Sequence, residues 1–226
     1  MTDIDVLIFA KYPQPGAVKT RMVPPLTFEQ AATLHRLSLQ VICEIVLDKA
    51  HLHATLVVTP DETADSFGRV IERNDVAYRP QGEGDLGTRL RRAVSRVFDD
   101  GGRDVILLGA DTPTLPLSYL QDAISALRRH DVVMGPCDDG GYYLLGLHGS
   151  HTALFEQIDW GGSLVASQTR ARADAAELNL AELPPWYDLD RFENLVRAAE
   201  DLRASSAGES AAQRRLRALI ELLTGD

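Results

Sequence analysis

The sequence predicts an α/β fold built on a mostly parallel sheet. Short apolar runs rich in Val, Ile and Leu, at residues 6–10, 54–59, 105–109 and 132–135, are typical of strands buried on both faces. Helical patterns lie between these runs, which indicates right-handed crossovers with helices on both faces of the sheet. Another apolar run, at residues 142–147, follows a Gly-rich turn, and we expect it to pair antiparallel and make the sheet mixed.

The helices are predicted from apolar residues at helical spacing. Residues 28–48 show this spacing clearly, and Thr27 is suited to cap the start of that helix. Further helices are expected at residues 63–73, 86–98, 117–129, 191–204 and 211–223, the last two within a C-terminal helical segment, 191–224. Residues 205–208 have the composition of a short flexible connection. In 226 residues no repeat or compositional boundary occurs, so we expect one domain spanning residues 1–226.

The charge and composition of the chain argue against some classes of partner and cellular location. The formal net charge is −10 and no basic stripe occurs, which argues against a nucleic-acid-binding surface. No apolar run approaches the ~20 residues needed to span a bilayer, and the acidic start of the chain is unlike a signal peptide. Only two cysteines occur, Cys43 and Cys137, without a metal-binding spacing. We therefore expect a cytoplasmic protein with small-molecule partners and no membrane association.

The first candidate site segment follows the first predicted strand. Ligands of open α/β sheets bind at the carboxyl ends of the strands. There, Lys11, Lys19 and Arg21 surround a turn at Pro15 and Gly16. Such a loop presents backbone N–H groups and positive charge to phosphate oxygens, although it matches neither a P-loop nor a dinucleotide fingerprint. A solvated surface turn is the alternative, but in so acidic a chain the cluster favours phosphate binding.

The second segment, residues 81–89, leads into a predicted helix. Its three glycines, at 82, 84 and 87, allow a flat ligand to approach the backbone closely. Turn formation, with Asp85 as an N-cap, explains the same residues without a ligand. Both interpretations stay open from the residues alone.

A carboxylate follows the strand at residues 105–109. Asp111 sits at its carboxyl end, where a hard divalent cation could take one or two carboxylates together with substrate phosphates. An Asx-turn before Pro113 is the alternative. We expect Asp188 to be a second metal ligand if residues 186–190 return to the sheet beside Asp111. Asp190 with Glu193 is instead interpreted as a capping box at the start of the next helix.

The turn between the last two predicted strands carries Asp138 and Asp139, followed by Gly140 and Gly141. Asp-Gly and Gly-Gly are ordinary turn dipeptides. The functional alternative is that the glycines let an acceptor approach the backbone, with a carboxylate facing it.

These motifs together resemble a known family. Residues 9–21 (FAKYPQPGAVKTR), 109–113 (GADTP) and Asp138 with 140–146 (GGYYLLG) are similar to the bacterial DUF2064 family. Its members are described as transferases or glycosyltransferases associated with radical-SAM enzymes. The resemblance implies the GT-A, nucleotide-diphospho-sugar transferase fold, three layers in α/β/α order, shared with the guanylyltransferases of molybdenum-cofactor and deazaflavin-coenzyme biosynthesis.

The resemblance also implies roles for individual residues. It makes Lys11, Lys19 and Arg21 phosphate contacts on the loop of Pro15 and Gly16. Nucleotide neighbours are Gln81, Gly84, Asp85 and Gly87. Asp111 becomes the ligand of Mg²⁺ or Mn²⁺.

Three functions are compatible with this set of residues. The first is metal-dependent glycosyl transfer from a nucleotide sugar to a small-molecule acceptor, with Asp138 or Asp139 orienting or deprotonating the acceptor. The second is nucleotidyl transfer from a nucleoside triphosphate to a phosphorylated small molecule, in which Lys19 and Arg21 stabilise the departing pyrophosphate. The third is a non-catalytic, nucleotide-binding regulatory domain. The family description favours the first, and the cationic loop favours the second.

Overall fold

The computed structural model describes residues 4–49, 51–73, 75–204 and 209–225. One seven-stranded sheet, in the order β3-β2-β1-β4-β6-β5-β7, runs through the molecule. Its strands are β1 (Ile4–Lys11), β2 (Leu52–Thr59), β3 (Ala77–Pro80), β4 (Asp104–Gly109), β5 (Val132–Pro136), β6 (Tyr142–His148) and β7 (Leu180–Glu182). Strand β6 is antiparallel to β4 and β5, and the other pairs are parallel. The predicted mixed, mostly parallel sheet is confirmed.

Seven α-helices accompany the sheet in the described part of the chain. They are α1 (Phe28–Leu47), α2 (Phe67–Ile71), α3 (Leu86–Asp99), α4 (Leu117–Leu127), α5 (Val165–Ala175), α6 (Glu193–Ala204) and α7 (Ala211–Thr224). Thr27 caps α1 as predicted, accepting from the Gln30 N–H at 3.2 Å while the Gln30 side chain accepts from the Thr27 N–H at 2.8 Å. The helix expected at 63–73 is divided into a 3₁₀ segment, Asp61–Ser66, and the short α2.

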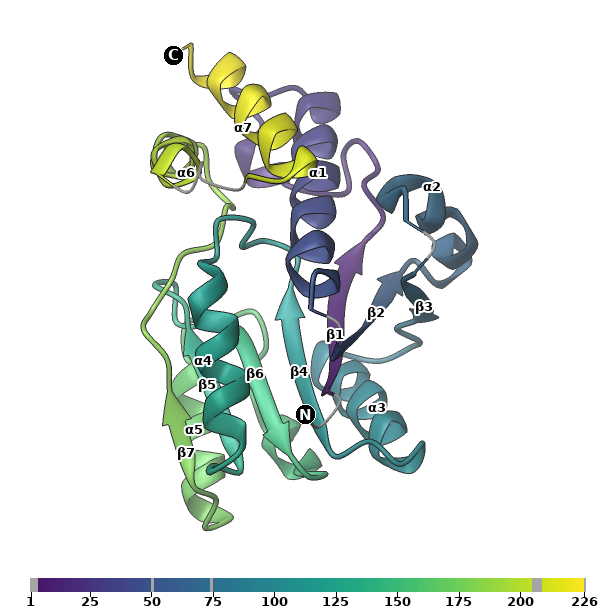
Figure 1. The fold of residues 1–226 in the computed structure, drawn as a ribbon, viewed down its shortest axis with the longest axis vertical. Coiled ribbons are helices and arrows are strands. Elements are labelled where there is room, and N and C mark those ends of the chain that lie inside the picture. Colours follow the sequence, from purple (N-terminus) through teal and green to yellow (C-terminus); the bar gives the residue numbers. More distant parts are fainter. Residues whose placement is uncertain (1–3, 50, 74, 205–208, 226) are drawn as a thin grey trace.

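The helices cover both faces of the sheet, which gives the three layers expected of the fold (Figure 1). Alternate residues of β1 point to opposite layers, because successive side chains of a strand alternate in direction. Ile8 joins the core beneath α1, α2 and α4, whereas Leu7 joins the core beneath α3 and α5. The central strands are therefore apolar on both sides, as their continuous runs of Val, Ile and Leu indicate.

A third apolar cluster lies outside the sheet and joins α1 to the C-terminal helices. Leu34 and Val41 of α1 pack with Leu195 of α6 and Leu216 of α7, and Met22 of the loop after β1 packs in the same cluster. Figure 1 shows α6 and α7 beside the start of α1, beyond the carboxyl ends of β1 and β4. This packing fixes the loop after β1 and the segment before α6 at one end of the sheet.

Three elements have no counterpart in the sequence prediction. Strands β3 and β7 lie at the two edges of the sheet, and neither contains a buried residue. Helix α5 covers β5 and β6 with a polar sequence in which only Val165, Ala166, Thr169 and Ala173 are buried. The connection predicted at residues 205–208 lies outside the described residues.

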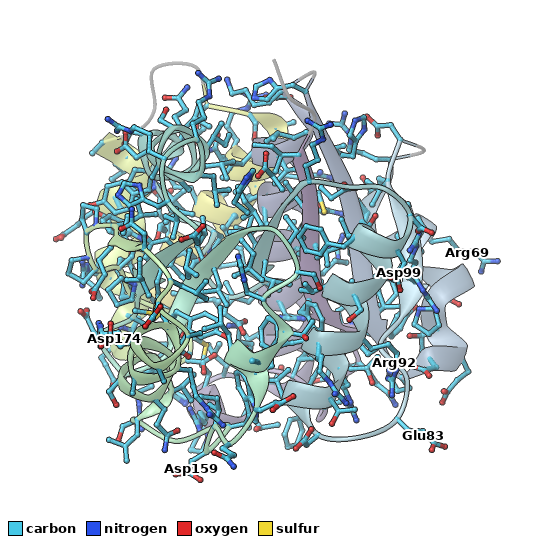
Figure 2. All side chains as sticks on the ribbon, turned by 90° about the horizontal axis from the view of Figure 1, so that it is seen from below. Arg69, Glu83, Arg92, Asp99, Asp159 and Asp174 are labelled. Atoms are coloured by element: carbon cyan, nitrogen blue, oxygen red, sulfur yellow. The ribbon has the colours of Figure 1, made fainter. Side chains whose placement is uncertain are left out.

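Charged side chains occupy the outside of these layers. In Figure 2 the labelled side chains of Arg69, Glu83 and Asp159 lie at the periphery of the molecule. Among the described helices, none combines the length and the apolar character that crossing a membrane requires.

The third cluster provides a test of how firmly the C-terminal helices are attached. We expect Leu216→Ala to lower the free energy of unfolding by about 2–5 kcal/mol, because Leu216 is fully buried against α1 and α6. The matched control is Leu222→Ala on the same helix, whose side chain is 78% exposed; it should change stability by less than about 0.5 kcal/mol. Urea unfolding measures both. Equal effects would show that α7 is not held by this cluster.

Candidate functional site

A cavity of about 610 Å³ opens over the carboxyl ends of β1, β2 and β4. Its walls come from the loop after β1, the start of α3, the end of β4 and the segment before α6. Of the residues predicted from the sequence, it is lined by Lys11, Lys19, Arg21, Gln81, Gly84, Asp85 and Asp111. Its size is within the range of small-molecule sites. The structure thus brings three of the separately predicted segments together around one space.

Lys19 is the most buried charged group of this cavity. Its side chain is 2% exposed, and its ammonium donates to the carboxylates of Asp111 and Asp190, the latter at 3.1 Å. Burial disfavours the charged ammonium, but the two carboxylates outweigh this effect and raise the pKa of Lys19. The backbone of Lys19 is left-handed (φ 49°), a conformation that is costly for a residue with a Cβ atom.

Asp111 stands at the end of β4, with its side chain 42% exposed to the cavity. His35 of α1 lies beside it, with Nδ1 3.7 Å from the carboxylate and Nε2 3.1 Å from the Lys11 carbonyl oxygen. Burial works against the charged carboxylate, yet Lys19 and His35 hold the pKa of Asp111 well below its usual range. Asp111 therefore carries its negative charge at neutral pH. Sequence reasoning missed His35, whose position on an apolar helix gave no signal.

Asp190 belongs to this cavity, contrary to its interpretation as a helix cap. Helix α6 begins at Glu193, and the Asp190 carboxylate accepts instead from Lys19 at 3.1 Å and from Arg21 Nη1 at 3.5 Å. The Asp-Leu-Asp spacing of residues 188–190 was the available signal. We assigned the functional carboxylate to the first of these two aspartates, and the cavity is lined by the second.

Asp188 lies close by, but it faces a different partner. The backbone N–H of Leu189 donates to the Asp111 carbonyl oxygen at 2.7 Å, so this segment does return to the sheet beside Asp111. The Asp188 carboxylate accepts from the Cys137 thiol at 3.3 Å and, with Asp139, forms a group whose potential ligand atoms lie within 4.8 Å of one another. Burial and the charge of Asp111 raise the pKa of Asp188 to about 7. Its predicted role as a metal ligand with Asp111 stays a prediction.

The segment after β3 forms one wall through its backbone. Gln81 is buried and donates its side-chain amide to the carbonyl oxygens of Ala10 at 3.3 Å and Val57 at 3.0 Å. Arg89, which the sequence analysis did not single out, donates to the Gly84 carbonyl at 2.8 Å and to Gln81 Oε1 at 3.2 Å. Both ends of this segment are therefore fixed, and the guanidinium of Arg89 joins the lining of the cavity.

Asp85 and Gly87 have structural roles in the same segment. Asp85 caps α3, accepting from the Thr88 N–H at 2.8 Å, as the alternative interpretation proposed, and it also lines the cavity. Gly87 is buried under other residues: a Cβ there would collide with the Trp160 ring and come within 2.8 Å of the Phe155 carbonyl oxygen. The close approach of α3 to Trp160 is thus a structural reason for a glycine at this position, and its predicted place beside a nucleotide stays a prediction.

The turn of the loop after β1 lies outside the cavity wall. Pro15 and Gly16 are exposed, and Gly16 has φ 81°, which a glycine adopts readily. Lys11 and Arg21 do line the cavity, and the Arg21 side chain is 64% exposed. The turn thus shapes the loop, while the cations on either side of it face the cavity.

The turn between β5 and β6 separates its two aspartates. Asp138 is exposed and lies 3.7 Å from the guanidinium of Arg197 on α6. Asp139 accepts from the Gly141 N–H at 2.9 Å and lines a second cavity of about 300 Å³. Of the two predicted acceptor-side carboxylates, only Asp139 reaches a cavity among those of the described residues. Phe9, Arg21 and Leu86 line both cavities, so the two spaces adjoin.

Comparison with solved structures gives the class of the fold. A protein from Desulfovibrio desulfuricans G20, provisionally named a nucleotide-diphospho-sugar transferase, is 32% identical over 98% of both chains, with a TM-score of 0.85. A 4-diphosphocytidyl-2C-methyl-D-erythritol synthase from Anaerococcus prevotii DSM 20548 is 12% identical, covering 89% of this chain and 96% of that one, with a TM-score of 0.59. A cytidylyltransferase from Leptospira borgpetersenii is 13% identical, covering 100% and 95%, with a TM-score of 0.56. The chain has the nucleotide-diphospho-sugar transferase fold.

The sequence itself identifies the family within this class. Residues 42–162 match the family described as "Uncharacterized protein conserved in bacteria (DUF2064)". The chain belongs to the DUF2064 family, as its motifs indicated, and the proteins it is similar to are named transferases and nucleotidyltransferases.

The raised pKa of Asp188 predicts a pH dependence of stability. The folded carboxyl group has a pKa of about 7, whereas an unfolded Asp has its ordinary pKa of 3.8. This group therefore makes the folded state less stable as pH rises between these values. Asp188→Asn mimics the protonated form. Urea unfolding should give similar stabilities for variant and wild type at pH 4.5, and a more stable variant at pH 7.5. If the free energies of unfolding of variant and wild type differed by the same amount at both pH values, the raised pKa of Asp188 would be contradicted.

Proposed function

We propose that this protein is a metal-dependent nucleotidyltransferase that joins a nucleoside monophosphate unit to a phosphorylated small molecule and releases pyrophosphate. The observation that carries the proposal is the charge of the first cavity. Four cationic side chains, Lys11, Lys19, Arg21 and Arg89, line it together with three carboxylates, Asp85, Asp111 and Asp190. A triphosphate carrying one divalent cation is more anionic than a nucleotide sugar carrying the same cation, and it complements this excess of positive charge better.

The donor atoms fit a hard divalent cation. Asp111 and Asp190 both line the cavity, and the Lys19 ammonium lies within hydrogen-bonding distance of both, so the space between the two carboxylates already accepts a cation. Carboxylate oxygens are the preferred protein ligands of Mg²⁺ and Mn²⁺. These two residues would hold the metal ion. When bound, Mg²⁺ or Mn²⁺ supplies neutralisation of the phosphate charge.

The remaining side chains of the first cavity act on the phosphates. Lys11 and Arg21 bind and orient the phosphate chain from the two ends of the loop after β1. An oxygen of the acceptor phosphate attacks the α-phosphorus, and the bond from that phosphorus to the β-phosphate bridging oxygen breaks. Pyrophosphate leaves with the electron pair, and the cations of this loop stabilise its charge. Arg21, which borders both cavities, holds the two reacting phosphates together.

Glycosyl transfer is the second candidate. It is favoured by the Desulfovibrio relative, which is provisionally named a nucleotide-diphospho-sugar transferase. In that reaction an acceptor hydroxyl attacks the anomeric carbon of the sugar and the nucleoside diphosphate departs, with Asp139 placed to take the hydroxyl proton. A non-catalytic nucleotide-binding domain would bind the same ligands without turnover.

One panel separates these functions. The protein is incubated with Mn²⁺ and either nucleoside triphosphates or nucleotide sugars, and thermal shift and product release are measured. We expect stabilisation by at least one triphosphate, and pyrophosphate release when a phosphate monoester is added. Release of nucleoside diphosphate from a nucleotide sugar, with no pyrophosphate from any triphosphate, would establish glycosyl transfer instead. Binding without any product would leave the regulatory function.

The carboxylates can be tested individually by metal binding. We expect Asp111→Asn and Asp190→Asn each to weaken Mn²⁺ binding in the presence of triphosphate by at least about tenfold, since loss of even an outer-sphere partner of a metal ligand has effects of this size. Electron paramagnetic resonance of free Mn²⁺ measures it. Asp138→Asn is the matched control, because Asp138 pairs with Arg197 and does not line the cavity. If Asp188→Asn weakened Mn²⁺ binding and Asp190→Asn did not, the second metal ligand would be Asp188, as the sequence predicts, and not Asp190.

Lys19 should have opposite effects on metal binding and on turnover. A divalent cation held by Asp111 and Asp190 must replace the Lys19 ammonium between them. We expect Lys19→Met to strengthen Mn²⁺ binding without nucleotide by about fivefold or more and to lower kcat by about 10²–10³. Lys11→Met is the control: Lys11 lines the same cavity, but no ion pair with a described residue holds it. It should leave metal binding without nucleotide unchanged.

A further inference from the structure

The second cavity has a different chemical character from the first. Its walls are formed mainly by the aromatic side chains of Phe9, Tyr142 and Trp160 and by the aliphatic side chains of Leu86, Leu90 and Val165. Of the described residues, only two bring charged side chains to it, Arg21 at its border with the first cavity and Asp139 from the β5–β6 turn. A ligand in this space therefore meets apolar surface on most sides and charge only at its ends.

The walls of this cavity are held in place by close packing. Trp160 stacks on Phe155 with ring centroids 6.5 Å apart and meets the edge of Tyr142 at the same distance. On the turn side, Gly140 (φ 90°) packs so closely on Ser163 that a Cβ would overlap its backbone. The cavity is therefore preorganised, which reduces the entropy lost when a ligand binds.

The polar groups of this cavity are too few for a carbohydrate. Every buried hydroxyl of a sugar needs a hydrogen-bond partner, and an unpaired one costs affinity. The Tyr143 hydroxyl already donates to the Pro184 carbonyl oxygen at 3.1 Å, and one Asp139 oxygen accepts from Gly141. The Tyr142 hydroxyl is buried without a hydrogen-bond partner among the described residues, so it and Asp139 are the side-chain groups left to pair with the several hydroxyls of a sugar. An aromatic or alicyclic ring, by contrast, gains from contact with Phe9, Tyr142 and Trp160.

We propose that the second cavity is the acceptor subsite and that it takes a compact phosphate monoester whose body is an apolar ring. The ring lies against Trp160 and Leu90, and Arg21 binds the phosphate where the two cavities meet. The Arg21 side chain is 64% exposed and is held by Asp190 at 3.5 Å, so its guanidinium has hydrogen-bond donors left for a phosphate. That this ligand is the acceptor of a reaction rests on the proposed nucleotidyl transfer. That the ligand binds in the second cavity does not depend on that proposal.

Trp160 provides a direct readout of binding. The chain has two tryptophans, and Trp186→Phe leaves Trp160 as the sole one. The full chain with this substitution is titrated with phenyl phosphate and with glucose 1-phosphate, two monoesters that share the phosphate and differ in the polarity of the ring. We expect saturable quenching by phenyl phosphate, with glucose 1-phosphate binding at least about tenfold more weakly. Equal or stronger binding of glucose 1-phosphate would overturn the proposal.

Gly109 offers a variant that fills the cavity without straining the backbone. It lines the second cavity and not the first, and a Cβ added there would meet only the Asp111 backbone nitrogen, at 4.0 Å. Gly109→Val should therefore abolish phenyl phosphate quenching while triphosphate still raises Tm with Mn²⁺. Gly68→Val is the matched control. Gly68 belongs to α2 and lines neither cavity, and a Cβ added there also meets open space. This variant should leave both readouts unchanged.

The outcomes distinguish this proposal from the proposed function. If triphosphate and glucose 1-phosphate released pyrophosphate while phenyl phosphate did not, nucleotidyl transfer would stand and the apolar acceptor would be wrong. If phenyl phosphate bound at Trp160 and Gly109→Val removed this binding, but no acceptor gave pyrophosphate, the subsite would stand and nucleotidyl transfer would be wrong. Quenching by phenyl phosphate that persists in Gly109→Val would place the ligand elsewhere and refute the subsite.

Discussion

The site depends on one buried cation between two carboxylates. The Lys19 ammonium is almost fully removed from water, and Asp111 and Asp190 satisfy its charge. A buried ammonium without such partners is so unfavourable that it would lose its proton or move to the surface. The loop after β1, the end of β4 and the segment before α6 are therefore held together by this charge. The left-handed backbone conformation of Lys19 is tolerated because these ion pairs hold the residue in place.

The space above the sheet is divided into two chemically different cavities. The first is lined by cationic side chains and carboxylates, and the second mainly by aromatic and aliphatic side chains. Phe9, Arg21 and Leu86 form the border between them. Two substrates bound in adjoining cavities have their reacting ends close together, which removes much of the entropic barrier to group transfer. Under the proposed function, this division would let each substrate be selected separately while the reacting groups stay close together.

The sequence predicted the central part of the fold and most of the polar residues that the structure brings together around the first cavity. Buried parallel strands show as continuous apolar runs, and the polar residues after them lie at the carboxyl edge by topology alone, which is why Lys19 and Asp111 could be found. The edge strands β3 and β7 contain no buried residue and left no such signal. Asp190 was misassigned because local capping rules explain an aspartate before a helix. Only the position of Lys19, 171 residues earlier, shows its other partner.

This long sequence separation has a consequence for how the protein matures on the ribosome. The last strand of the sheet ends at Glu182, so the sheet can form while Asp190 and the helices that support it are still inside the ribosome. A nascent chain of that length would have the architecture of the family but would lack one of the two acidic partners of Lys19. The charge pairing of Lys19 is then complete only when α6 and α7 dock on α1. Formation of the sheet and completion of the Lys19 charge pairing are therefore separable steps in the folding of this chain.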